Sequence, residues 1–192
     1  SMLGGFTKAT SGSVTFNGRE IKGLAPFEVC RLGLARTFQI TQAFPTLSVR
    51  EIVLAAALAG NSEAEAAVAL ADEIIARMKL SARSDVKSAD LTLAEQRRLE
   101  IARALATRPR LILLDEILGG LTPREADEAI DNIRSIRDSG ITVLVIEHMV
   151  RAVMTLCDRI IVLDAGEAIS LGTPQEISRD PRVIEAYLGD AA

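Results

Sequence analysis

The sequence predicts an α/β fold that contains a buried parallel sheet and a separate helical block, and three observations support this. Residues 111–114, 141–146 and 160–163 are continuous aliphatic runs of strand length, a pattern typical of strands buried on both faces. Helical patterns lie between these runs, so the order is strand, helix, strand, helix, strand. Residues 48–108 carry helical patterns and no strand signal.

The chain before the helical block is predicted to contain a small β-hairpin. Residues 14–16 and 19–21 flank the dipeptide Asn17-Gly18, which is the strongest short signal for a two-residue hairpin turn. We therefore expect three segments: the hairpin segment at residues 1–47, the helical block at 48–108, and the α/β segment at 109–192.

Three helices are predicted within the helical block, at residues 48–58, 63–80 and about 93–106. Before the second of them, Ser62 and Glu65 have the spacing of a capping box. The apolar residues of this second helix recur at helical spacing and are expected to face the core: Ala67, Leu70, Ala71, Ile74, Ile75 and Met78.

The clearest helix boundaries in the chain lie between the first two aliphatic runs. Thr122 is predicted to cap this helix, Pro123 to occupy its first turn, Glu125 to complete a capping box and Gly140 to end it. Further helices are expected over residues 150–156, after Thr173 and over 181–188. The apolar face of the helix after Thr122 consists of Ala126, Ala129, Ile130, Ile133 and Ile136.

Composition excludes several classes of protein. The chain has 192 residues and a net charge of −4, and this acidic balance argues against a nucleic-acid-binding surface. Its longest apolar run, residues 52–59, is far shorter than the roughly 18 residues that a membrane span needs. The two cysteines, Cys30 and Cys157, lack disulfide or metal spacing, so reduced thiols in a cytoplasmic protein are expected. A single histidine excludes a histidine-cluster metal site.

The candidate catalytic and metal-binding residues follow directly after the predicted strands. Asp115-Glu116 follow the first aliphatic run and Glu147-His148 follow the second, and open α/β sheets bind ligands at the carboxyl ends of their strands. A Mg²⁺ ion on one carboxylate and a polarised water beside the other would offset the cost of placing two acids there. The alternative is that both acids simply reach solvent. If Asp115-Glu116 is considered without the other residues, this alternative and the Mg²⁺ interpretation are about equally favoured. His148 favours the first interpretation, as a donor to a phosphate.

The order of these motifs resembles that of ABC-type ATPases. Residues 91–106, 109–116, 120–123 and 146–148 occur in the sequence and spacing of that family, and Arg36-Thr-Phe-Gln39 resembles its glutamine loop. The tail, residues 163–189, resembles the ATP-binding subunits of branched-chain amino acid importers. The resemblance extends over the chain from Thr10 onward, and it implies a P-loop NTPase core with an inserted helical subdomain.

The resemblance also implies roles for individual residues. Asp115 and Gln39 would bind Mg²⁺, and Glu116 would act as the base for the attacking water. Gln39 would in addition touch this water and link the site to a membrane subunit. His148 would contact the γ-phosphate of ATP. These roles suit phosphoryl transfer, in which catalysis consists mostly of positioning and charge neutralisation.

In the same family, a signature segment contacts the nucleotide held by a second ATP-binding subunit. The residues that resemble it here are Thr92, Ala94 and Glu95, and Thr122 stands in the loop that contacts the partner subunit. Ala94 replaces a glycine whose backbone approaches phosphate closely, and Thr122 replaces an aspartate or asparagine. Thr92 with Glu95 also has capping-box spacing, so a weakened signature and a simple helix cap are equally weighted interpretations.

One motif of such ATPases does not occur in the sequence. No Gly-x-x-x-x-Gly-Lys-Ser/Thr is found among the 192 residues, so the phosphate-cradling loop, its strand and its helix are expected to be missing from an N-terminally truncated chain. Residues 1–47 then represent the remnant of the antiparallel β subdomain with the glutamine loop. We expect weak or absent MgATP binding, no ATPase activity of this chain as given, and self-association through uncovered sheet surface.

The functional expectation is an ATP-binding and ATP-hydrolysing subunit of an importer for branched-chain amino acids or related small amides. Its cofactors would be ATP and Mg²⁺. Its partners would be transmembrane permease subunits, a second ATP-binding subunit and, indirectly, a periplasmic binding protein, with no nucleic acid. It would lie in the cytoplasm on the inner face of the cell membrane. Two alternatives remain: a nucleotide-free interaction module derived from this family, and a soluble ABC ATPase of DNA repair or translation.

Overall fold

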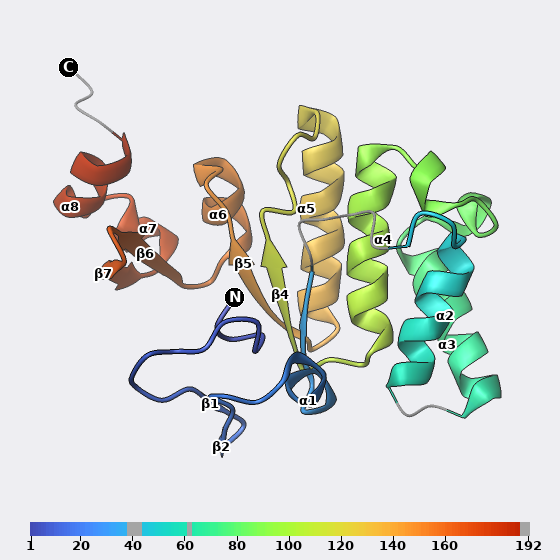
Figure 1. Ribbon diagram of the computed structural model, residues 1–192. Coiled ribbons are helices and arrows are strands. Elements are labelled where there is room, and N and C mark those ends of the chain that lie inside the picture. Colours follow the sequence, from blue (N-terminus) through green and yellow to red (C-terminus); the bar gives the residue numbers. More distant parts are fainter. Residues whose placement is uncertain (38–43, 61–62, 189–192) are drawn as a thin grey trace. The chain divides into compact units, whose positions relative to one another are not determined.

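The computed structural model describes residues 1–37, 44–60 and 63–188 (Figure 1). These residues form two compact units, Ser1–Ile146 and Glu147–Ala192, and each unit has its own secondary structure. Within the described ranges, no helix combines the length and the apolar character that crossing a membrane requires.

The predicted N-terminal hairpin is present. Strand β1 (Thr15–Phe16) pairs antiparallel with β2 (Arg19–Glu20). Asn17 and Gly18 between them have φ angles of 48° and 75°, the pair of positive values that a type I′ turn requires. The Ile21 N–H donates to the Val14 carbonyl at 2.8 Å, which continues the pairing beyond the short strands.

A three-stranded parallel sheet forms the centre of the first unit. Its order is β3 (Leu34–Arg36), β4 (Leu111–Asp115) and β5 (Thr142–Ile146), with β4 in the middle. Strands β4 and β5 confirm two of the predicted aliphatic strands, whereas β3 and the short helix before it, α1 (Pro26–Arg31), had no sequence prediction. All three strands run in one direction, so their carboxyl ends lie along one edge of the sheet.

The helical block consists of three packed helices, α2 (Val49–Ala59), α3 (Ala64–Arg77) and α4 (Leu93–Ala106), which lie side by side in Figure 1. Short 3₁₀ turns at Ser81–Arg83 and Ser88–Asp90 connect α3 to α4. The predicted apolar stripe of α3 is confirmed, since all its members are buried except Leu70, which is half-buried. The predicted capping box of Ser62 with Glu65 is wrong, because the N-cap of α3 is Glu63; Ser62 itself lies outside the described residues.

Helix α5 (Pro123–Asp138) packs against β5 and begins and ends as predicted. The Thr122 side chain caps its first turn, and Gly140, with φ of 91°, follows the C-cap residue Ser139. Its predicted apolar face is buried, apart from the half-buried Ala129. Helix α5 therefore covers one face of the parallel sheet.

The second unit corrects one sequence prediction. It contains α6 (Val150–Leu156), β6 (Ile160–Asp164), β7 (Glu167–Gly172), α7 (Pro174–Ile177), α8 (Pro181–Val183) and a π turn (Ile184–Leu188). The aliphatic run at 160–163 was predicted as a third strand of the parallel sheet, and this is wrong. Strand β6 pairs antiparallel with β7, through a turn in which Ala165 and Gly166 have φ of 46° and 86°. One face of β6 is exposed, with Ile161 and Leu163 at 62% and 58%.

The Asp180 side chain joins strand β7 to helix α8 through hydrogen bonds. Its carboxylate accepts from the Arg182 N–H and guanidinium, both at 3.0 Å, and from the Ser170 hydroxyl at 2.6 Å. The hydrogen bonds from Arg182 and then Ser170 lower the pKa of Asp180 from 3.8 to about 2.

A pH dependence follows from this lowered pKa. Because the folded-state pKa lies below the unfolded value, the stabilisation is present above about pH 4 and is lost as the pH falls towards 2. We expect Asp180→Asn to reduce the loss of thermal stability between pH 5 and pH 2.5, measured by circular dichroism. Asp164→Asn removes an equal charge at an exposed position of the same unit and should keep the wild-type pH profile. Identical profiles for the wild type and Asp180→Asn would contradict this account.

Candidate functional site

Asp115, the predicted metal ligand, ends the central strand β4 and is held by an arginine. The Arg36 Nη2 atom lies 2.7 Å from Asp115 Oδ2, and the two side chains are only 16% and 17% exposed. Arg36 ends the neighbouring strand β3, and its guanidinium lies 5.6 Å from the centroid of the Phe6 ring. Arg36 therefore supplies the cation that a carboxylate at the end of a buried strand needs.

Thr37 completes this arrangement. It is 1% exposed, its N–H donates to the Leu113 carbonyl at 2.9 Å, and its hydroxyl accepts from the Asp115 N–H at 3.2 Å. The chain leaving β3 is thus bonded to the end of β4 by backbone and side chain. Arg36 and Thr37 were noted in the sequence only as part of the segment that resembles the glutamine loop, with no individual roles, because the contact of Arg36 with Asp115 joins residues 79 positions apart.

Glu116, the predicted base, has an unusual backbone. Its φ is 48°, a left-handed conformation that costs a non-glycine residue about 1–3 kcal/mol and clusters at functional sites. The surroundings fix this conformation, because the Glu116 N–H donates to the Ile146 carbonyl at 2.9 Å and the next residues, Ile117 and Leu118, are 1% and 0% exposed. The result is a sharp turn that leaves Glu116 exposed at the edge of the sheet.

The structure does not test the roles of two further predicted site residues. Gln39 lies outside the described residues, so its contact with Mg²⁺ and water stays a prediction. His148 lies two residues after the end of β5, in the second unit. Its approach to a γ-phosphate beside Glu116 likewise stays a prediction.

The signature-like segment begins helix α4 as a capping box. The Thr92 hydroxyl accepts from the Glu95 N–H at 3.3 Å, and Glu95 Oε2 accepts from the Thr92 N–H at 2.9 Å. The other carboxylate oxygen of Glu95 accepts from Arg83 Nε at 2.8 Å. Partial burial tends to raise the pKa of Glu95, but the bonds from Thr92 and Arg83 lower it below its usual value. The capping interpretation is confirmed, and the role of Thr92, Ala94 and Glu95 toward a nucleotide stays a prediction.

Thr122 has the same arrangement at the start of α5. Its N–H and hydroxyl both donate to Glu125 Oε2, at 2.8 and 2.7 Å. The hydroxyl bond, followed by the backbone bond, lowers the pKa of Glu125. Thr122 is thus a helix cap, and its contact with a partner subunit is untested.

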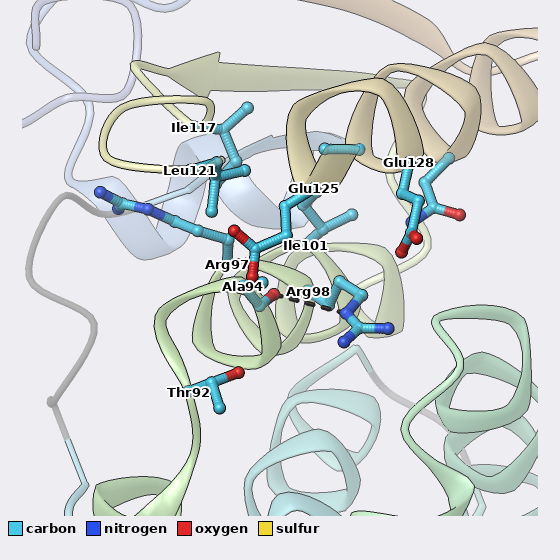
Figure 2. Close-up of a pocket in the computed structure, with 11 residues that line it drawn as sticks. Thr92, Ala94, Arg97, Arg98, Ile101, Ile117, Leu121, Glu125 and Glu128 are labelled. Carbon is cyan, nitrogen blue, oxygen red and sulfur yellow. Dashed lines mark hydrogen bonds between the residues drawn. The ribbon is translucent and has the colours of Figure 1, made fainter. Parts of the chain in front are cut away.

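A pocket of about 150 Å³ lies between the N-terminal halves of α4 and α5 (Figure 2). Thr92, Ala94 and Arg97 line one side, and Leu121 and Glu125 line the other. The Nε and Nη1 atoms of Arg97 are buried without a hydrogen-bond partner within the described part of the chain. Asp115 and Glu116 do not line this pocket. The structure therefore brings the start of α4 near the start of α5, while the two acids lie at the edge of the sheet.

Asp115 and Glu116 suit Mg²⁺ chemically. Mg²⁺ prefers oxygen ligands and is usually bound by one or two carboxylates together with substrate phosphates. Arg36 engages Asp115 through the Oδ2 atom. Within residues 1–37, 44–60 and 63–188, no three histidine, cysteine, aspartate or glutamate side chains come together as potential metal ligands.

Comparison with known proteins assigns the class to which this fold and this strand-end site belong. The ABC transporter family matches residues 1–119, and a branched-chain amino acid ATP-binding cassette transporter family matches residues 169–192. The first match covers more than half of the chain, and the chain belongs to the ABC transporter family.

Individual relatives agree with this assignment. The chain is 37% identical to the high-affinity branched-chain amino acid transport ATP-binding protein BraF of Pseudomonas aeruginosa, with 98% of this chain and 80% of BraF covered. It is 36% identical to LivG of Salmonella typhimurium, a protein of the same description, at the same coverage. A solved nucleotide-free ATP-binding cassette of an ABC transporter is 29% identical with a TM-score of 0.86, over 98% of this chain and 81% of that one.

Proposed function

We propose that the chain is the ATP-binding subunit of an ABC importer and that it energises the uptake of branched-chain amino acids. The observation that carries this proposal is the end of β4, where Arg36 and Thr37 fix Asp115 and the left-handed turn presents Glu116. The names of BraF and LivG and the match of residues 169–192 support the substrate class.

In this proposal Asp115 would hold Mg²⁺, together with Gln39. Mg²⁺, when bound, supplies charge neutralisation for the transferred phosphate. Arg36 holds the Asp115 carboxylate and Thr37 holds the Asp115 backbone N–H beforehand, so that little ordering remains when the metal binds.

Glu116 would take a proton from the attacking water. Its carboxylate lies one residue beyond the metal ligand, and the backbone bond from Glu116 to Ile146 holds that position. A positioned carboxylate within hydrogen-bond reach of the attacking water is the group that general-base catalysis requires. His148 would donate a hydrogen bond to the γ-phosphate.

A second subunit completes the site in this proposal. Thr92, Ala94, Glu95 and Thr122 would face the nucleotide held by a second ATP-binding subunit. None of the 192 residues supplies a Gly-x-x-x-x-Gly-Lys-Ser/Thr cradle, so for this chain alone we expect weak or no MgATP binding. The complex would include transmembrane permease subunits and act with a periplasmic binding protein, which places the chain on the cytoplasmic face of the membrane.

Uptake measurements test this function. We expect deletion of the gene that encodes this chain to abolish energy-dependent uptake of labelled leucine, and unlabelled isoleucine and valine to compete for uptake in the undeleted strain. Uptake of an unrelated amino acid such as lysine is the control and should persist. Normal leucine uptake after the deletion would contradict the proposal.

A nucleotide-free interaction module is a second candidate, and two observations favour it. The sequence lacks the phosphate-binding motif, and the polar groups of Thr92 and Glu95 are engaged in a helix cap. Purification of the complex through a tag on this chain separates the two candidates. Saturable MgATP binding that is lost in Asp115→Asn favours the ATPase, whereas a complex without such binding favours the module.

A further inference from the structure

A second polar hollow lies at the edge of the parallel sheet opposite to Asp115 and Glu116. Its volume is about 380 Å³, within the range of small-molecule sites. Four elements contribute to it: the β1–β2 hairpin, the end of α1, the start of β3 and the segment before β4. Its lining residues are Phe16, Asn17, Arg19, Arg31, Leu32, Gly33, Arg108 and Arg110.

The charged residues that line this hollow are all positive. Four of its eight lining residues are arginines, and none is an aspartate or glutamate. None of these four arginines belongs to the ion pairs found among the described residues; Arg31 lies over the Phe27 ring, 5.6 Å from its centroid. The guanidinium group stays charged at any physiological pH. Four like charges around one hollow repel one another, on a chain whose net charge is −4, so an anion placed there would be favoured.

Hydrogen bonds to the parallel sheet hold the backbone segment that carries Arg108 and Arg110. The Arg110 N–H donates to the Gly33 carbonyl at 2.8 Å, and the Arg110 carbonyl accepts from the Thr142 N–H at 3.0 Å. Arg108 holds a left-handed φ of 54°, and Pro109 separates it from Arg110. Two of the four arginines therefore project from a segment whose position is fixed by the sheet, which reduces the ordering that ligand binding requires.

The hollow is separate from the proposed ATP site. Arg110 precedes β4 and Asp115 ends it, and five residues of strand span about 16 Å. An anion bound by these arginines would therefore lie at the other end of the central strand from the proposed Mg²⁺.

We propose that this hollow is a binding site for a phosphate-bearing ligand, held by Arg19, Arg31, Arg108 and Arg110. Guanidinium groups bind phosphate through two parallel hydrogen bonds, and several of them can share one dianionic group. The volume of the hollow exceeds that of a bare phosphate, and the side chains of Phe16 and Leu32 form an apolar part of its lining. The ligand is thus a phosphate ester or a diphosphate, whether free in solution or as a phospholipid headgroup.

Pyrophosphate is the probe that tests this site. We expect saturable calorimetric binding of pyrophosphate to the purified chain, with affinity that falls as salt rises. Arg31→Gln/Arg110→Gln should weaken binding at least tenfold, and Arg110→Lys should weaken it less because the charge remains. Arg179→Gln is the matched control, since it removes an exposed arginine from the second unit, and it should bind as the wild type does.

Three outcomes would overturn the proposal: no binding by the wild type, equal binding by the double variant, or equal weakening by Arg179→Gln. Circular dichroism verifies that the double variant is folded. If it is not, Arg19→Gln, an exposed position on the hairpin, takes its place with the same expectation of weaker binding. A second arm compares vesicles of phosphatidylcholine with and without phosphatidic acid. Arginine-dependent binding to the acidic vesicles that exceeds pyrophosphate binding identifies a headgroup, and the reverse identifies a free ligand.

Discussion

Glu116→Gln is expected to lower the ATP hydrolysis rate of the assembled transporter by about 100-fold or more, since a positioned general base contributes roughly 10²–10⁴-fold. The glutamine keeps the shape of the side chain but cannot accept the proton of the attacking water. Because Asp115 and its bonds to Arg36 and Thr37 are untouched, ATP affinity should remain close to that of the wild type. The measurement is phosphate release at saturating ATP, beside ATP binding, on the transporter assembled in cells from the product of the chromosomal gene, since the 192 residues alone are expected to bind MgATP weakly or not at all.

Glu128→Gln provides the matched control for this experiment. Glu128 lies on α5 in a surface ion pair with Arg124, with side chains 48% and 89% exposed. Such pairs contribute little, so the hydrolysis rate should stay within about twofold of the wild type. A Glu116→Gln complex that hydrolyses ATP as fast as the control would show that Glu116 is not the base.

Arg36→Gln is expected to destabilise the purified chain by about 2 kcal/mol, because a hydrogen bond to a charged group contributes roughly 1.5–3 kcal/mol and Asp115 would be left without its cation. The Arg36–Asp115 pair is short, at 2.7 Å, and joins the ends of two adjacent strands that are far apart in sequence. The measurement is the free energy of unfolding from urea titration followed by circular dichroism.

Arg50→Gln is the control, because Arg50 also pairs with an aspartate, Asp72, at 2.9 Å but with side chains 46% and 52% exposed. Arg50→Gln should lower the free energy of unfolding by less than about 1 kcal/mol. Asp115→Asn in the Arg36→Gln background should add less than it does alone, since one interaction is already missing. If Arg36→Gln and Arg50→Gln lower the free energy of unfolding equally, the Arg36–Asp115 pair contributes no more to stability than an exposed ion pair.

Local signals in the sequence predicted much of the fold. The Asn17-Gly18 turn, the caps at Thr92 and Thr122 and the apolar stripe of α3 depend on residues that are neighbours in the chain. Such features arise from backbone conformation and short-range hydrogen bonds, which a sequence pattern records directly. These elements therefore agree with the structure to within a few residues.

Apart from the N-cap of α3, the errors concern pairing between strands. The aliphatic run of β6 suggested burial on both faces, yet Ile161 and Leu163 are exposed and the strand pairs with β7. The decisive signal was the Ala165-Gly166 turn, which permits an immediate antiparallel return. Strand β3 has only three residues, too few for a hydrophobic period to be recognised.

The candidate site was predictable in part. Asp115 and Glu116 follow from the rule that ligands bind at the carboxyl ends of parallel strands. The contact of Arg36 with Asp115 depends on β3 lying beside β4, and that strand pairing had no local signal. For the same reason, the sequence did not indicate that Arg19, Arg31, Arg108 and Arg110 line one hollow.

Leucine transport by a chromosomal Glu116→Gln strain tests whether branched-chain amino acid uptake depends on Glu116 at the end of β4. The comparison strains carry a Glu128→Gln change or a deletion of the gene. We expect initial leucine uptake in the Glu116→Gln strain to fall to the level of the deletion, at unchanged protein abundance, while the Glu128→Gln strain matches the wild type. Wild-type leucine uptake in the Glu116→Gln strain would contradict this expectation.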